Sequence, residues 1–144
     1  MNHRQQKKLS RRLFQAIWSS DTGAAKAALR AGAAPERRND VGTTPLYEAS
    51  VSGRAEIATL LLVAGAAPDT ESAGLGAEGT PLCAAACWGH TATVRTLLAH
   101  GANPNLREEH GTGRPPIAWT HDGPHGPHHE TAALLTAAGV ITAG

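Results

Sequence analysis

The sequence predicts an all-α solenoid of about four stacked helix-turn-helix units with projecting loops. Two observations predict this architecture: a set of landmark residues recurs at an almost constant spacing, and each recurrence carries helix start and stop signals at matching positions. The composition agrees. Hydrophobic residues make up 41% of the 144 residues but aromatic residues only 3%, so much of the core must be alanine, which suits helices that approach closely.

The repeat is clearest between the second and third units. Thr44-Pro45-Leu46 recurs 36 residues later as Thr80-Pro81-Leu82. Further landmarks recur at the same offset: Gly53 as Gly89, Leu61-Leu62 as Leu97-Leu98, and Gly65-Ala66 as Gly101-Ala102. Several matches within one shared frame are hard to obtain by chance, so these stretches are two copies of one structural unit.

The first and last units keep the frame less strictly. In the first unit, Leu13, Ala16 and Gly32 stand 33 residues before their counterparts in the second. In the fourth, Pro116-Ile117, Leu134-Leu135 and Gly139 keep the frame around an insertion between Asp122 and Pro127. We therefore predict a basic N-terminal tail at 1–8, followed by four units at about 9–41, 42–77, 78–111 and 112–144.

Each unit is predicted to form a first helix, a short turn, a second helix and an extended loop. The hydroxyl of Thr44 or Thr80 can cap the first helix, and the proline that follows sits where its missing N–H costs nothing. The second helices are expected at about 55–64 and 91–100, where leucines recur at helical spacing. A glycine then ends each of them, because glycine tolerates left-handed backbone.

These residues resemble the ankyrin repeat, whose pattern of Thr-Pro-Leu-His, Ala-Ala, Gly-His, Leu-Leu and Gly-Ala is matched most closely between residues 80 and 105. The resemblance covers the chain from about Leu9 onward. Tyr47 and Cys83 depart from it, since they stand where the family has histidine. The resemblance implies a non-enzymatic protein-protein interaction module, an adaptor, scaffold or inhibitor, with a concave groove built from first helices and loop tips.

Candidate partner-binding residues follow from that frame. The positions just before Gly53 and Gly89, and their equivalents in the first unit, are implied to face the groove: Trp18, Ser19, Val51, Ser52, Cys87 and Trp88. Exposed tryptophans are typical of recognition surfaces, although the alternative is that Trp18 and Trp88 merely pack against neighbouring loops. The loop tips add residues of mixed charge, which favour a protein partner: Arg38, Asp40, Val41, Thr43, Glu71, Glu78, Arg107, Glu109 and His110.

Charge and cysteine content limit the kinds of partner and the cellular location that the sequence favours. The formal net charge of +1 favours neither nucleic acid nor a membrane as the partner. Five of the 13 basic residues lie within the first 12 positions, which hold no acid, so the rest of the chain is acidic overall. The two cysteines form no disulfide framework, and no apolar run is long enough for a membrane span or a signal peptide. We therefore expect a cytoplasmic, monomeric protein without a cofactor.

Two stretches offer competing chemistry. Residues 74–79 spell the Gly-x-Gly-x-x-Gly of nucleotide-binding turns, but no apolar strand precedes them and the next acid, Glu108, lies 29 residues beyond Gly79. Residues 121–130 include six side chains of types that can bind metal ions: His121, Asp122, His125, His128, His129 and Glu130. The glycines and prolines between them prevent these side chains from sharing one face of a helix. We expect a flexible loop and a solvated insertion. The alternative function is a metal- or nucleotide-dependent enzyme that uses the 121–130 insertion or the 74–79 loop.

The cysteines are a third chemical signal. Cys83 and Cys87 lie four residues apart, so they share one helix face. No further cysteine or histidine completes a tetrahedral metal site beside them, and no neighbouring base is visible that would activate a thiol. We expect Cys83 to pack in the groove wall and Cys87 to be partly exposed.

Overall fold

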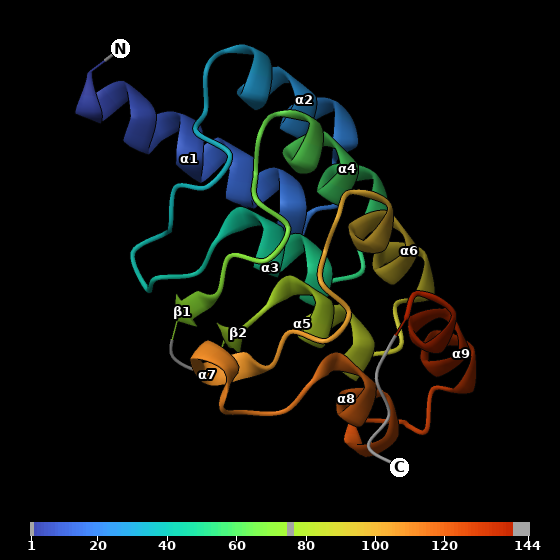
Figure 1. The fold of residues 1–144 in the computed structure, drawn as a ribbon. Coiled ribbons are helices and arrows are strands. Elements are labelled where there is room, and N and C mark those ends of the chain that lie inside the picture. The colour runs from blue at the N-terminus through green and yellow to red at the C-terminus, as the bar shows by residue number, and fades with distance from the viewer. Residues whose placement is uncertain (1, 75–76, 140–144) are drawn as a thin grey trace.

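The computed structural model describes residues 2–74 and 77–139, and within them four helical pairs lie side by side (Figure 1). Smaller elements lie in the loops: a four-residue helix and an antiparallel hairpin of two strands. The pairs are α1 (His3–Trp18) with α2 (Thr22–Arg30), α3 (Pro45–Val51) with α4 (Ala55–Val63), α5 (Pro81–Cys87) with α6 (Thr91–Ala99), and α8 (Pro116–Asp122) with α9 (His129–Ala137). The loop elements are β1 (Ser72–Gly74), β2 (Ala77–Gly79) and α7 (Glu108–Gly111).

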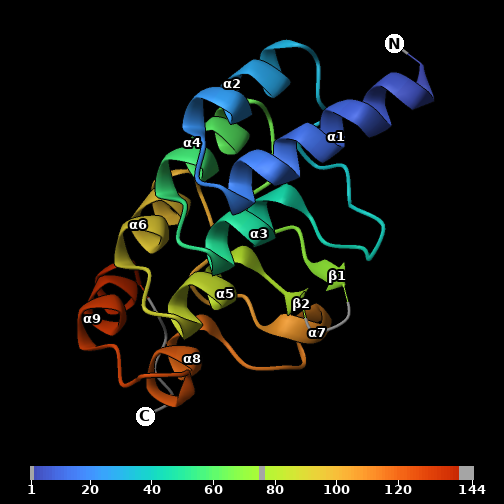
Figure 2. The same ribbon diagram turned by 180° about the vertical axis from the view of Figure 1, so that it is seen from behind.

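The helices form two rows. The first helices α1, α3, α5 and α8 make one row and the second helices α2, α4, α6 and α9 make the other, as both views show (Figures 1 and 2). Each helix contacts its partner within the pair and the corresponding helix of the next pair. The predicted helical solenoid is therefore confirmed, and the small hairpin is an addition that the repeat pattern did not indicate.

The first helices of the two middle pairs begin as their sequence predicts. The Thr44 hydroxyl accepts a hydrogen bond from the Tyr47 amide at 3.1 Å, and the Thr80 hydroxyl accepts one from the Cys83 amide at 3.2 Å. A proline occupies the first turn of both helices. These caps satisfy amides that have no partner inside the helix, and each contributes about 1 kcal/mol.

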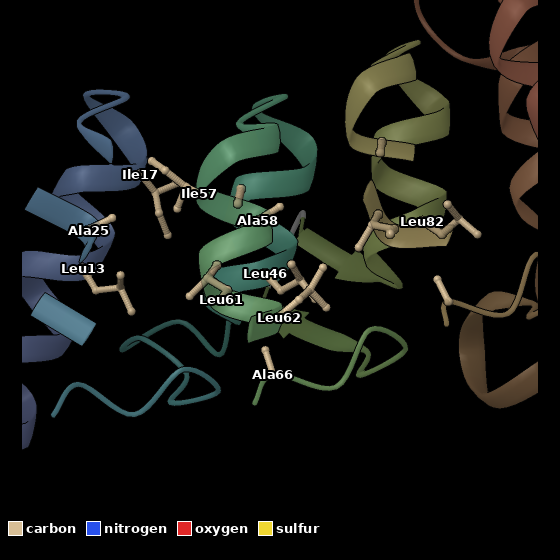
Figure 3. Packing of buried hydrophobic residues seen from close by; sticks show 14 of the residues in the cluster. Leu13, Ile17, Ala25, Leu46, Ile57, Ala58, Leu61, Leu62, Ala66 and Leu82 are labelled. Atoms are coloured by element: carbon tan, nitrogen blue, oxygen red, sulfur yellow. The ribbon is translucent and has the colours of Figure 1, made fainter. Parts of the chain in front are cut away.

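The core runs continuously between the rows and from pair to pair. Its largest fully buried side chains are leucine, isoleucine and valine, and alanines fill the space where helices approach closely. Figure 3 shows Leu13 and Ile17 of α1, Ile57 and Leu61 of α4, and Leu82 of α5 within this cluster. No pair could bury these faces alone, so the stability of each depends on its neighbours.

A polar contact links each pair to the one before it. The His90 ring lies at the start of α6, and its Nε2 is 3.1 Å from the Val51 carbonyl oxygen at the end of α3. A Cβ at Gly53, whose φ is +71°, would lie 2.6 Å from this ring, so glycine is needed there both for its conformation and for its size. At the preceding junction, Arg54 takes this role and donates to the carbonyls of Ile17 and Trp18.

The basic segment expected as an N-terminal tail is instead the beginning of α1. Asn2 caps the helix: its Oδ1 accepts from the Gln5 amide at 2.8 Å, while the Gln5 side chain accepts from the Asn2 amide at 3.3 Å. Gln6 then bonds the Gly32 carbonyl at 2.8 Å and the Ala34 amide at 3.2 Å. The first turns of α1 are therefore tied to the loop that follows α2.

The glycine-rich stretch is also ordered on both sides of Leu75 and Gly76, which lie outside the described residues. β1 and β2 pair in register, Ser72 with Gly79 and Gly74 with Ala77. Ser72 Oγ accepts from the Thr44 amide at 3.2 Å, and the Ala73 amide donates to the Gly42 carbonyl at 3.2 Å. The hairpin is thus anchored to the loop before α3.

In the described part of the chain no helix has the length and apolarity to cross a membrane.

Candidate functional site

The row of first helices and the loops beside it hold two cavities. The first, of about 370 Å³, lies between α1 and the loop 37–41. Four residues of α1 line this cavity, and they lie on one face of the helix because they are three or four positions apart: Lys7, Arg11, Phe14 and Trp18. Trp18 is 54% exposed, and its ring centroid lies 5.8 Å from that of Phe14. We call this region the basic end of the groove.

The loop wall of the basic end is held by short-range hydrogen bonds. Asn39 Oδ1 accepts from the amides of Val41 at 3.1 Å and Thr43 at 3.0 Å, which turns the loop back toward α3. Arg38 donates to the Gly42 carbonyl at 3.0 Å and to the Glu71 carbonyl at 2.8 Å. Asp40 and Val41 are left at the exposed tip. The Arg38 contacts join the two successive loops into one wall.

The second cavity, of about 510 Å³, lies further along the same row. Tyr47 and Val51 of α3, Cys83 and Cys87 of α5, and the hairpin strands line it on one side. Trp88, which is 44% exposed, and Trp119 of α8 add aromatic surface. Its charged lining residues are all acidic: Glu71, Glu108 and Glu109. We call this region the acidic end.

Glu108 is the best-defined carboxylate of the acidic end. Trp119 Nε1 donates to its Oε2 at 3.1 Å, which orients the carboxylate. Burial raises the pKa of Glu108 above its ordinary value, and the charges of Glu109 and Glu71 raise it further against the hydrogen bond from Trp119. One face of the Trp119 ring is occupied, because the Arg114 guanidinium lies 4.8 Å from its ring centroid. The same guanidinium forms an ion pair with Asp122.

The two thiols in the groove wall are poor nucleophiles. Cys83 is buried, and burial chiefly raises its pKa to about 12, partly offset by a hydrogen bond with Thr80. Cys87 is half-buried, and desolvation raises its pKa as well. The positions expected for the two cysteines agree with the structure. Both thiols stay protonated near neutral pH, so neither is activated as a nucleophile or a metal ligand.

The structure brings together most of the predicted partner-binding residues. Trp18, Arg38, Asp40 and Val41 line the cavity of the basic end. Val51, Cys87, Trp88, Glu71 and Glu109 line that of the acidic end. The two tryptophans are thus partly exposed beside cavities rather than covered by the loops.

Other predicted residues lie elsewhere. Thr43 is only 2% exposed and its amide is bonded to Asn39 Oδ1, so its side chain is buried beneath the loop rather than presented at the tip. Ser19 bonds the Gln15 carbonyl and lines a different cavity, of about 390 Å³, between α1 and α2. Ser52 ends α3 without lining any of these cavities. Arg107 is exposed and donates to the Gly113 carbonyl at 3.1 Å. The side chains of Glu78 and His110 lie outside the described residues.

Four important lining residues were missed, each for an identifiable reason. Lys7 and Arg11 share a helix face with Trp18, a signal hidden by treating the basic residues of the first 12 positions only as a local excess of charge. Trp119 went unnoticed because the fourth unit matches the repeat frame loosely. Glu108 precedes the predicted Glu109, but only the path of α7 places its carboxylate beside Trp119.

The histidine-rich insertion is partly structural. His128 Nε2 lies 3.2 Å from the Cys87 carbonyl oxygen and 3.0 Å from that of Pro124, so His128 joins the fourth pair to the third as His90 joins the third to the second. His121 Nδ1 contacts Asp122 at 2.9 Å. Across residues 2–74 and 77–139, His, Cys, Asp and Glu side chains form no group of three placed to hold a metal ion. Gly74 and residues 77–79 belong to paired antiparallel strands rather than to the turn between a strand and a helix that a nucleotide site requires.

Comparison with known proteins agrees with this architecture. A family model of ankyrin repeats, described as three copies, matches residues 13–108, which is well over half of the chain. The chain is also similar to the E3 ubiquitin-protein ligase Ufd4 of Drosophila melanogaster, at 33% identity over 130 residues. That match covers 90% of this chain but only 4% of the length of the ligase. The stacked helical pairs and the family match lead to one conclusion: the chain belongs to the ankyrin repeat family.

Proposed function

We propose that the chain is a non-enzymatic interaction module that binds a partner protein in the groove along its first helices. The observation that carries the proposal is the placement of Trp18, Val51 and Trp88, from three successive pairs, at two neighbouring cavities. Trp18 and Trp88 expose 54% and 44% of their surfaces. Large aromatic groups beside concave surface are typical of binding hot spots.

The chemistry of the groove supports binding rather than catalysis. The two thiols are held protonated, and the carboxylate of Glu108 is already oriented by Trp119 rather than by a histidine or lysine. Within the insertion, His128 is engaged with two carbonyl groups. These contacts favour an adaptor, scaffold or inhibitor over the alternative of a metal- or nucleotide-dependent enzyme. That the module acts as a cytoplasmic monomer is part of the proposal and does not rest on these contacts.

Capture of the native partner from host extract tests the proposal. The variant Val51→Glu with Trp88→Ala is expected to weaken binding by about thirtyfold or more, as loss of a hot spot does. Val63→Glu is the matched control, because Val63 is 73% exposed on α4 in the row of second helices. Circular dichroism should show unchanged helix content in both variants. Equal partner capture by wild type and the groove variant would contradict the proposal.

A further inference from the structure

The two cavities of the groove carry opposite charge. Lys7, Arg11, Arg37 and Arg38 line the basic end against the single carboxylate of Asp40. Three glutamates line the acidic end, and no basic residue is among its lining residues. The chain as a whole is nearly neutral, with a formal net charge of +1. The separation of charge is therefore a local property of the groove that the net charge conceals.

The ends are far enough apart to act on different parts of a ligand. Packed helices lie about 8–10 Å apart, so α1 and α5 are separated by roughly 20 Å across α3. Salt at physiological strength screens charges beyond about 8 Å. Arg38 and Glu71 meet where the two loops join, but Lys7 and Arg11 on α1 lie away from that junction, as do Glu108 and Glu109 at the other end. These two outer pairs therefore attract the ligand charge next to them almost independently of each other. A ligand whose charges are all of one sign would be attracted to one end of the groove and repelled by the other.

An extended polypeptide fits this spacing. At about 3.3 Å per residue, a strand of about six residues spans roughly 20 Å. The apolar surface of Trp18, Val51 and Trp88 lies along its route from one end to the other. A folded partner can present such a segment as a loop or an unpaired strand, and a disordered partner can present it directly.

We propose that the groove binds an extended polypeptide segment whose acidic residues lie at the basic end and whose basic residues lie at the acidic end, with apolar residues between them. This inference rests on the proposed function and states the chemistry of the partner. A lysine or arginine side chain at the acidic end would meet Glu108, Glu109 and the exposed ring of Trp88.

The environment of Glu108 supports a cationic occupant. Its carboxylate is partly desolvated and lies near Glu109 and Glu71, which together raise its pKa. A partner cation would offset both the desolvation and the repulsion. The Arg114 guanidinium already lies on Trp119, so the ring that a partner cation can reach is that of Trp88. At the other end, Arg38 is bonded to backbone carbonyls, which orient its charge without neutralising it.

Labelled synthetic peptides of about ten residues, matched in composition, test the charge pattern by fluorescence anisotropy. One has an acidic block, an apolar middle and a basic block. A second interleaves the same residues, so its net charge is identical. We expect the block peptide to bind about tenfold more tightly, the size that two or three exposed charge pairs supply, and this preference should fade at high salt. Binding of the two peptides within twofold of each other would overturn the proposal.

Charge reversal assigns each end. Lys7→Glu with Arg11→Glu should weaken the block peptide about tenfold and improve binding of a peptide whose acidic block is replaced by a basic one. Lys8→Glu with Arg12→Glu is the matched control, since these exposed residues lie on the same helix outside the cavity. Glu109→Lys should produce the opposite switch, with Glu130→Lys on α9 as its control. Reversals without such a switch would also overturn the inference.

The outcome separates this inference from the function on which it rests. If the native partner is lost with Val51→Glu and Trp88→Ala while the two peptides bind alike, the interaction module stands and the charge pattern is wrong. If neither the partner nor any peptide is affected by groove variants, the proposed function itself fails.

Discussion

The third and fourth helical pairs reach the same packing from different sequences. The third begins with Thr80-Pro81 and a side-chain cap, whereas the fourth begins with Pro115-Pro116, and proline has no side-chain group to offer the first amides. Both nevertheless place a histidine against the pair before them: His90 on Gly53 and His128 on Gly89. The fourth pair therefore keeps the histidine contact with the pair before it, although its first helix has no side-chain cap. It follows that stacking, more than capping, sets the register of the last pair.

The largest expected effect separates internal from terminal pairs. Leu97 of α6 and Leu135 of α9 are both 0% exposed and occupy corresponding positions. Leu97→Ala should reduce the free energy of unfolding by about 2–5 kcal/mol, because its cavity lies between two pairs. Leu135→Ala should cost less, since the terminal pair can open by itself. Urea denaturation measures the global loss, and hydrogen exchange should show that Leu135→Ala loosens α9 alone. Equal global losses would contradict the comparison.

The next prediction concerns the close contact between Gly89 of the third pair and the His128 ring of the fourth. A Cβ at Gly89, where φ is +70°, would lie 2.4 Å from the His128 ring, so Gly89→Ala should cost about 2 kcal/mol from backbone strain and steric clash together. Gly101 is the matched control: its φ is +90° and a Cβ there would have no neighbour within 4 Å among the described atoms. Gly101→Ala should cost about 1 kcal/mol from backbone strain alone. Adding His128→Ala to Gly89→Ala should recover part of the difference in urea midpoints.

Removing a cap makes the third pair begin more like the fourth. Thr80→Ala deletes the hydroxyl that accepts from the Cys83 amide, and should lower the free energy of unfolding by about 1 kcal/mol. Thr91→Ala on α6 is a useful reference, because its hydroxyl contacts Thr131 between pairs rather than capping a first helix. If Thr80→Ala unfolded the third pair outright, capping rather than stacking would control its register.

A pH effect distinguishes the same two pairs, because Ala118 of the fourth stands where the third has Cys83. Burial raises the pKa of Cys83 from 9.0 to about 12, so its protonated thiol stabilises the fold fully below pH 9. That contribution is lost as the pH rises from about 9 to about 12. By pH 10 the free energy of unfolding should have fallen by about 1 kcal/mol. Cys83→Ala should reduce the fall in urea midpoint between pH 8 and pH 10. An identical fall in both proteins would exclude the thiol as its cause.

The repeating part of the molecule was predictable because its signals are local. Thr44, Thr80 and the prolines after them act within one helical turn, and the leucine spacing predicts which face is buried. These features led to the stacked pairs, and the family frame led to Trp18, Val51 and Trp88 as groove residues. All three residues line the cavities that the structure contains.

The remaining parts depend on contacts between distant segments. The capping box of Asn2 and Gln5 is visible in the sequence, but Gln6 reaches a loop 26 residues away to secure the first turns of α1. Thr43 is buried because of how its loop turns, which its residue type does not reveal. Trp119 and Glu108 meet only when α7 and α8 fold against the third pair. Composition and spacing carry little information on such meetings.

The length of α1 has a practical consequence. It has 16 residues, whereas α3, α5 and α8 have seven each, so it is about 14 Å longer than they are. Residues 2–8 add no side chain to the common core, yet they include Lys7 and part of the cavity wall. A fragment that begins at the repeat boundary, Leu9, would keep most of the packing between its helices. It would lose Lys7 and with it part of the wall of the first cavity. Sound folding of a shortened chain is therefore a poor guide to whether its recognition surface is whole.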